Sequence, residues 1–278
     1  MAGAVDAFLA AADLLLPIGY LSAAIAYGVL FFAGHGLARR LSTPLLSGTA
    51  ALHVTYLVVL TLRYRQFPAV TVSQALSVVA LAVALVYLLV EWHGRERSTG
   101  LWLVSLVFVF QLLASLLGGE APPDREIFHS ALFASHVSLA LLGYAAFVVA
   151  AGYGFLFLEL YRDLKAGRFS TFYGKLPPLE VLERMMTGAL AVGFVALTGA
   201  VGLGVFWAER TFPGRWLGDP KILFTLATWA LYAVALLLRR TRRWRGRQTA
   251  LASLAGLAAI LFSLLAVNLL FSEFHGAL

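Results

Sequence analysis

Eight apolar runs, each long enough to cross a lipid bilayer as a helix, dominate this sequence. A hydrocarbon core about 30 Å thick requires roughly 20 mostly apolar residues in an α-helix. Within that core the backbone N–H and C=O groups must find partners inside the protein, which favours helices. The runs cover residues 14–34, 45–62, 71–91, 101–118, 131–160, 185–207, 221–238 and 249–271. The sequence therefore predicts an all-α integral membrane protein, a polytopic bundle of about eight transmembrane helices.

The composition agrees with this class and excludes several kinds of chemistry. The chain is 61% hydrophobic and 13% charged, about half the charged fraction of an ordinary soluble domain. No change of composition divides it, so we predict a single transmembrane domain over residues 1–278. Cysteine is absent, which excludes disulfides, thiolate metal sites and thiol redox chemistry. We also find no nucleophile triad, phosphate-binding glycine loop or zinc signature.

Lys and Arg residues indicate how the chain is oriented, because cytoplasmic loops retain an excess of them. Fifteen fall in one set of alternate loops and six in the other. The larger set contains Arg39, Arg40, Arg95, Arg97, Arg162, Lys165, Arg168, Lys175, Arg184, Arg239, Arg240, Arg242, Arg243, Arg245 and Arg247. We therefore expect the loops with these residues to face the cytoplasm and both termini to lie outside, on the periplasmic side of a bacterial inner membrane.

Two segments between the runs are expected to serve the membrane fold. The basic loop at 239–248 is expected to bind anionic lipid headgroups and to fix the topology, and we predict no nucleic-acid partner. The connector at 175–184 has leucines at helical spacing, which predicts an amphipathic segment at the interface with a packing role. Glycines within the run at 185–207 are expected to let helices pack closely.

Histidines inside membrane segments are costly and are therefore candidates for function. His53 lies in the middle of the second run, where a satisfied core histidine and a second metal or haem ligand are both open interpretations. His136 lies near the outer end of the fifth run, and small residues follow it on the same helix face. His275 lies beyond the eighth run, and Asn268 precedes it on a polar stripe. The predicted topology brings His136 and His275 to the same side of the membrane.

An external loop at 208–220 lies between these two histidines in the sequence. The loop and its flanks combine Trp207, Trp216, Arg215, Asp219 and Lys221. These residues fit an aromatic belt with interfacial charges. They also fit a platform for a flat, dianionic aromatic ring, because indoles stack on rings and cations pair with carboxylates. Two neutral imidazoles would supply axial ligands to an iron in such a ring, which describes haem.

The stretch WLGDPKILFTLATWALYA at 216–233 resembles the tryptophan-rich WWD signature, roughly WxWDPKExWALxTWxxYA, of the cytochrome c assembly family. Members of this family carry a histidine on each flank of the signature, in contexts like HVxxxxxxY and VNxxxxGLHSY. Here His136 with Tyr144 is similar to the first context, and Asn268 with His275 is similar to the second. The matching positions of the signature are Trp216, Asp219, Pro220, Lys221, Thr228, Trp229 and Tyr232.

The chain also departs from this pattern at several positions. Gly218 replaces the second tryptophan, and Ile222 replaces an acidic residue. The histidine that larger haem lyases carry near the end of the penultimate helix is missing from LLLRRTRR. With eight runs and a short chain, the sequence is more similar to the HemX subgroup than to the CcsA-type lyases. The resemblance covers most of residues 100–278.

The resemblance implies a membrane protein that holds non-covalently bound, b-type haem at the outer face for cytochrome c biogenesis. His136 and His275 would be the iron ligands, and Trp207, Arg215, Trp216, Asp219, Lys221 and Asn268 would bind the rest of the ring. We expect a chaperone or delivery role and not an enzyme, with lyase activity only alongside a partner. Expected partners are haem, apocytochrome c and other membrane proteins of cytochrome c biogenesis. The alternatives are a HemX-type regulator of haem biosynthesis, acting through cytoplasmic loops, and a small-molecule transporter around His53.

Overall fold

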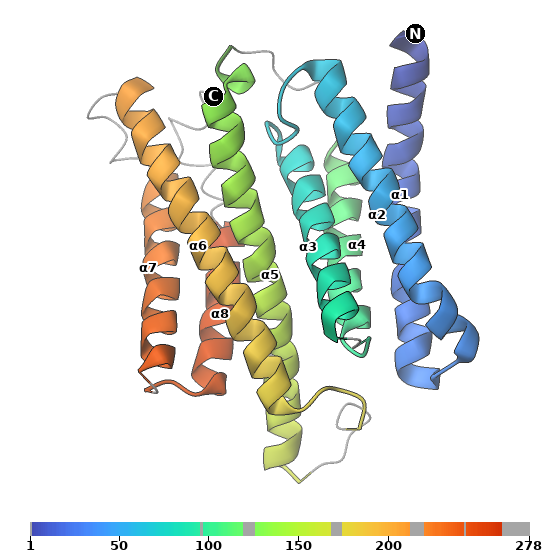
Figure 1. The fold of residues 1–278 in the computed structure, drawn as a ribbon, viewed down its shortest axis with the longest axis vertical. Helices are drawn as coiled ribbons and strands as arrows, with labels where there is room; N and C mark the ends of the chain where they lie inside the picture. Colours follow the sequence, from blue (N-terminus) through green and yellow to red (C-terminus); the bar gives the residue numbers. More distant parts are fainter. Residues whose placement is uncertain are drawn as a thin grey trace. The chain divides into compact units, whose positions relative to one another are not determined.

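A computed structural model describes residues 2–94, 97–118, 126–167, 174–211, 220–241 and 243–262 (Figure 1). All regular structure within these ranges is helical, and they contain no strand. The elements are α1 (Ala2–Ala33), α2 (Gly36–Tyr64), α3 (Val72–Gly94), α4 (Gly100–Leu117), η1 (Glu126–His129), α5 (Ala131–Lys165), α6 (Leu179–Thr211), α7 (Pro220–Arg240) and α8 (Gly246–Phe262).

Seven of the helices, α1 to α7, are long and apolar enough to cross a membrane. The described part of α8 is apolar but has only 17 residues, and the rest of the predicted run at 249–271 lies outside the described residues. These helices confirm the predicted all-helical, multi-pass membrane class. The outward orientation of both termini stays a prediction.

Several helices extend well beyond the apolar runs from which they were predicted. α1 begins at Ala2 and not near residue 14, because the preceding residues are rich in alanine, the best helix former. α5 has 35 residues, which gives it a length of about 52 Å at 1.5 Å per residue. Within the connector at 175–184, α6 already begins at Leu179, and the position of this segment at the membrane interface stays a prediction. Its packing role is confirmed, because Leu176 and Leu182 are buried.

The described residues group into two compact units, residues 1–134 and 135–278. In the first unit α1 packs against α2 and α4, and α3 packs against α4 and α2. The four helices therefore form a closed antiparallel bundle, with successive connections at opposite ends (Figure 1). Compact grouping is not evidence of independent folding, so the single domain over residues 1–278 stays a prediction.

α1 illustrates why such a helix requires a membrane. One face buries Leu16, Tyr20, Ala23 and Tyr27 within the first unit. The other face exposes Leu14, Ile18, Leu21, Ile25, Val29 and Phe32, at spacings of three and four residues. A helix that is apolar on both faces is suited to lipid on the side that lacks a protein neighbour.

In the second unit, close helix contacts depend on small residues. A Cβ built on Gly143 of α5 would lie 3.2 Å from the carbonyl oxygen of Gly193 on α6. A Cβ on Gly154 would lie 3.3 Å from Cα of Ala250 on α8. α7 completes the unit by packing against α6 and α8. The predicted packing role of the α6 glycines is confirmed at Gly193, where a side chain would also collide with Phe147.

Candidate functional site

His136 lies in the second turn of α5, and its half-buried imidazole contacts α6. Its Nδ1 lies 2.8 Å from the backbone carbonyl oxygen of Ala200. A carbonyl oxygen only accepts hydrogen bonds, so Nδ1 carries the proton and donates it. When the ring is neutral, its lone pair is then on Nε2. This is the tautomer of a histidine that binds a metal through Nε2 and donates its other N–H to a backbone carbonyl.

The surface of α6 beside His136 carries another of the predicted site residues. Gly204 follows Ala200 by one helical turn, and a Cβ built on it would lie 2.7 Å from Cε1 of His136. Trp207 follows Gly204 by three residues, a spacing that makes two helix residues surface neighbours. The guanidinium of Arg210 lies 4.1 Å from the ring centre of Phe206. The described C-terminal end of α6 therefore places the Trp207 indole near the part of the helix that His136 contacts.

The helical half of the WWD-like stretch holds α7 in its unit. The indole N–H of Trp229 donates a hydrogen bond to the Thr198 hydroxyl on α6, at 2.9 Å, and its ring stacks on Phe194. Tyr232 is fully buried and stacks on Phe147 of α5, with ring centroids 3.9 Å apart. These two residues fix α7 against α5 and α6. They thereby position the first turn of α7, at Pro220, where the external loop ends.

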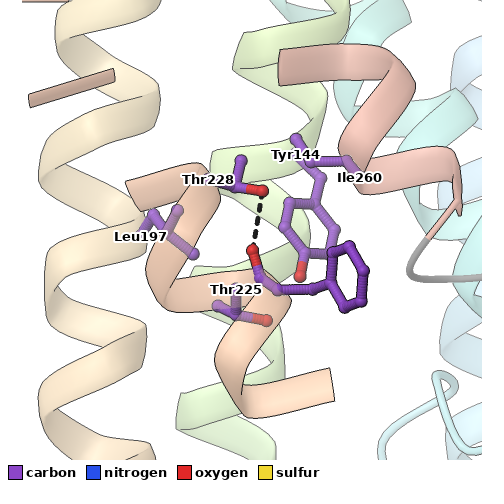
Figure 2. A pocket seen from close by; sticks show the side chains of 6 residues that line it. Tyr144, Leu197, Thr225, Thr228 and Ile260 are labelled. Carbon is purple, nitrogen blue, oxygen red and sulfur yellow. Dashed lines mark hydrogen bonds between the residues drawn. The ribbon is translucent and has the colours of Figure 1, made fainter. Parts of the chain in front are cut away.

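A small pocket lies among the four helices of the second unit, beside residues 224–228 of α7 (Figure 2). Its lining consists of Tyr144, Leu197, Phe224, Thr225, Thr228 and Ile260. Three of these side chains carry hydroxyl groups, and that of Thr228 donates a hydrogen bond to the carbonyl oxygen of Phe224 at 2.8 Å. Tyr144 lies eight residues beyond His136, about 12 Å further along α5. The space is too narrow for a water molecule, so the pocket by itself does not accommodate a porphyrin.

Most of the remaining predicted site residues lie outside the described part of the chain. These are Arg215, Trp216, Asp219, Asn268 and His275. Lys221 lies in the first turn of α7, but its side chain is not described. Whether these residues approach His136 therefore stays a prediction.

His53 is fully buried in the first unit and has a partner on each ring nitrogen. The Tyr20 hydroxyl lies 3.0 Å from Nδ1, and Oγ of Ser77 lies 2.8 Å from Nε2. Ser77 donates its own proton to Oε1 of Gln111 at 3.0 Å, so its oxygen accepts from Nε2–H. Nδ1 then accepts from Tyr20. This arrangement favours the satisfied core histidine over the metal ligand, because a ligating nitrogen must have its lone pair available.

From Gln111 the hydrogen bonds continue through Ser115 to Asp13, toward the end of the first unit at which α1 begins. The Gln111 amide donates to the Ser115 hydroxyl at 3.4 Å, and Ser115 donates to the Asp13 carboxylate at 3.0 Å. The donors and acceptors along this chain are therefore matched from Tyr20 to Asp13. Polar side chains that bond across helices stabilise membrane bundles, and a packing role accounts for the whole chain.

A buried carboxylate that was not predicted from the sequence lies at the other end of the first unit. Glu91 accepts hydrogen bonds from the hydroxyls of Tyr27 and Thr43, and its Oε1 lies 2.9 Å from Nε of Arg97. Its side chain is only 4% exposed. The available signal for this carboxylate was its place in the sequence: Glu91 ends the apolar run at 71–91, and Arg95 and Arg97 follow it closely. The cluster joins α1, α2, α3 and the residues before α4 at the end that we predict to be cytoplasmic.

The histidines that were not proposed as ligands have ordinary structural roles where their side chains are described. His35 is the N-cap of α2, and its Nδ1 accepts a hydrogen bond from the backbone N–H of Leu37 at 3.3 Å. Nδ1 of His129 donates to the carbonyl oxygen of Arg65 at 2.8 Å. Arg65 ends α2 in the left-handed conformation. His129 and His136 thus both direct Nδ1 at a backbone carbonyl, and His136 is the one of the two at a position that the resemblance singles out.

These features define a multi-pass helical membrane protein with a ligand-like histidine in its C-terminal unit. Residues 49–275 match the family described as Cytochrome C assembly protein, and the chain belongs to that family. The match includes the WWD-like stretch and both histidines that the resemblance singled out.

Named relatives extend this similarity across most of the chain. The chain is 28% identical over 235 residues to the cytochrome c biogenesis protein CcsA of Synechococcus sp. (strain CC9605), covering 75% of this chain and 77% of the relative. It is 28% identical over 295 residues to CcsA of Parasynechococcus marenigrum (strain WH8102), covering 95% and 96%. The similarity therefore reaches further toward the N-terminus than the residues on which the resemblance was first recognised.

Proposed function

We propose that this chain is a haem-binding membrane protein of cytochrome c biogenesis, situated in a bacterial inner membrane. It holds non-covalently bound, b-type haem at the outer face and delivers it to apocytochrome c or to another membrane protein of cytochrome c biogenesis. The relatives named cytochrome c biogenesis protein CcsA support the process. The observation that carries the ligand assignment is the hydrogen bond from His136 Nδ1 to the Ala200 carbonyl.

The described residues fit haem as a ligand. His136 has the tautomer needed to bind iron through Nε2, and an N–H held by a carbonyl orients such a ring and increases its basicity. His275 is the proposed second ligand. Trp207, Trp216 and Asn268 would line the ring, and Arg215 and Lys221 would pair with its carboxylates. Asp219 would accept a hydrogen bond from the second ring N–H of a ligating imidazole. Bound haem would supply the redox-active iron that the mature cytochrome needs.

The chain's own part in this process is binding, orientation and delivery. It has no cysteine, so it has no thiol of its own to add to a haem vinyl group. Its residues therefore keep the haem in place until cysteines of a partner meet the vinyl groups. The partner supplies the reacting thiols.

The test is the absorption spectrum of the purified full-length protein after addition of haem. We expect a low-spin spectrum with two imidazole ligands, and we expect His136→Ala and His275→Ala each to abolish it. Exogenous imidazole should restore binding to these variants if the cavity is preserved. Trp216→Phe and Asp219→Asn should also weaken haem binding, whereas residues of a simple aromatic belt would tolerate both changes. Unchanged spectra in both histidine variants would contradict the proposal.

A HemX-type regulatory role makes a different prediction, because it depends on the basic loop at 239–248. Within this loop Arg239 pairs with Glu183 of α6 at 2.7 Å, so its removal would disturb the fold. Replacing Arg240, Arg243, Arg245 and Arg247 with glutamine is the cleaner experiment. A regulator would lose its effect on haem synthesis, whereas the haem spectrum of a delivery protein would be unchanged.

A further inference from the structure

The geometry points to Gly204 as the positioning residue for His136. We infer that the missing side chain at residue 204 makes room for the imidazole and allows its Nδ1 to reach the Ala200 carbonyl. The inference rests on the proposed function, in which His136 binds iron. It adds a residue on a different helix that sets the direction of the ligating nitrogen.

The space at Gly204 is filled by one edge of the His136 ring. A Cβ built on Gly204 would lie 2.7 Å from Cε1, 3.0 Å from Nδ1 and 3.6 Å from Nε2. The shortest of these is well below an ordinary carbon–carbon contact of about 3.5–4.0 Å. Any side chain at residue 204 therefore forces the ring to move. The atoms closest to it include Nδ1, which makes the hydrogen bond.

Ala200 and Gly204 act together because they are one helical turn apart. In an α-helix the N–H of residue 204 bonds to the carbonyl of residue 200. A carbonyl oxygen has two lone pairs, so the Ala200 oxygen accepts a second hydrogen bond from His136 at 2.8 Å. That second bond approaches from the side of the helix on which Gly204 lies. α6 therefore presents a hydrogen-bond acceptor, the Ala200 carbonyl oxygen, and one helical turn later the space left by the missing side chain of Gly204.

Other glycines of α6 differ from Gly204 in what they contact. A Cβ on Gly202 or Gly188 would have no atom within 4 Å. A Cβ on Gly199 would meet only the end of the Leu139 side chain, at 3.2 Å. Gly193 faces Phe147 and has a packing role. Gly202 is therefore a matched control, on the same helix and two residues away, for the loss of backbone freedom that accompanies any glycine-to-alanine change.

The experiment compares Gly204→Ala with Gly202→Ala in the full-length, detergent-purified protein titrated with haem. We expect Gly202→Ala to behave as the parent does. We expect Gly204→Ala to lose the low-spin spectrum and to bind haem about 10–100-fold more weakly, the range typical for loss of a group that orients a metal ligand. Gel filtration and thermal unfolding of both variants check that the fold is intact.

A double variant separates positioning from helix packing. In a His136→Gly background, exogenous imidazole is not attached to α5, so it can shift to avoid an added methyl group. Gly204→Ala should then have little further effect on imidazole-restored haem binding, because the two changes act through the same ring. An equal loss in both backgrounds would mean that Gly204 acts through packing, and it would overturn the inference.

The outcomes also separate this inference from the proposed function. If His136→Ala leaves the haem spectrum unchanged, the assignment of His136 as an iron ligand in the proposed function is wrong and the inference is wrong with it. If His136→Ala abolishes the spectrum while Gly204→Ala matches Gly202→Ala, the function stands and the positioning role is wrong.

Discussion

The indole N–H of Trp229 donates a hydrogen bond to the hydroxyl of Thr198, and this contact joins α7 to α6. Trp229 belongs to the helical part of the WWD-like stretch, whereas the predicted haem platform is the external loop at 208–220 and its flanks. The Trp229 side chain serves the packing of the second unit. The stretch thus has two parts: the external loop, which we propose to bind haem, and the first turns of α7, which hold that loop's end in place.

The contact between Trp229 and Thr198 can be measured by a double-mutant cycle. Trp229→Phe removes the donor and keeps an aromatic ring against Phe194, whose centroid lies 5.5 Å away. Thr198→Val removes the acceptor at nearly constant volume. We expect a coupling free energy of about 0.6 kcal/mol, the average for such bonds in a membrane protein, from unfolding in mixed micelles. Fully additive effects would show that the bond does not stabilise the unit.

Tyr232 and Gly256 provide a stronger test of packing in the same unit. A Cβ on Gly256 of α8 would lie 2.2 Å from Cζ of Tyr232, and the ring cannot move away because it stacks on Phe147. Gly256→Ala should therefore destabilise the protein by about 1–3 kcal/mol, as overpacking does. The control is Gly188→Ala, which meets no atom within 4 Å and should be neutral or slightly stabilising, because alanine is the better helix former. Equal thermal stability of the two variants would contradict this packing.

The sequence predicted the class of protein and most helices, because apolar length and period depend on local composition alone. It did not predict which helices meet. Ala200 and Gly204 appear as ordinary small residues of an apolar run, and only their place beside His136 gives them a role. Likewise Tyr20 and Ser77 lie 33 and 24 residues from His53, a separation that no local pattern connects. Glu91 is a single acidic residue at the end of an apolar run, and its hydrogen-bond partners Tyr27 and Thr43 lie 64 and 48 residues away in the sequence.

His53 should matter for stability and not for haem. His53→Ala leaves the Tyr20 hydroxyl without its acceptor and the Ser77 oxygen without its donor. We expect a loss of about 1–3 kcal/mol, the cost of buried polar groups that lose their partners. Thermal unfolding should reveal this loss, while the haem spectrum of the folded fraction should match the parent. A haem spectrum that disappears in His53→Ala but persists in His136→Ala would move the site into the first unit.

The predicted topology can be tested with single cysteines, since the chain has none of its own. The structure decides where to place them. Gly246 is unsuitable in the basic loop, because a Cβ there would lie 2.5 Å from Phe157, whereas Arg245 is exposed. At the N-terminus Gly3 has no atom within 4 Å of a built Cβ. We expect an impermeant thiol reagent to label Gly3→Cys in intact spheroplasts and to label Arg245→Cys only after the membrane is opened, because fifteen of the 21 Lys and Arg residues lie in the loops assigned to the cytoplasm. Labelling of Arg245→Cys but not of Gly3→Cys in intact spheroplasts would invert the topology. It would also place His136 on the cytoplasmic side, since the N-terminal end of α5 and the N-terminus of the chain are predicted to share one face.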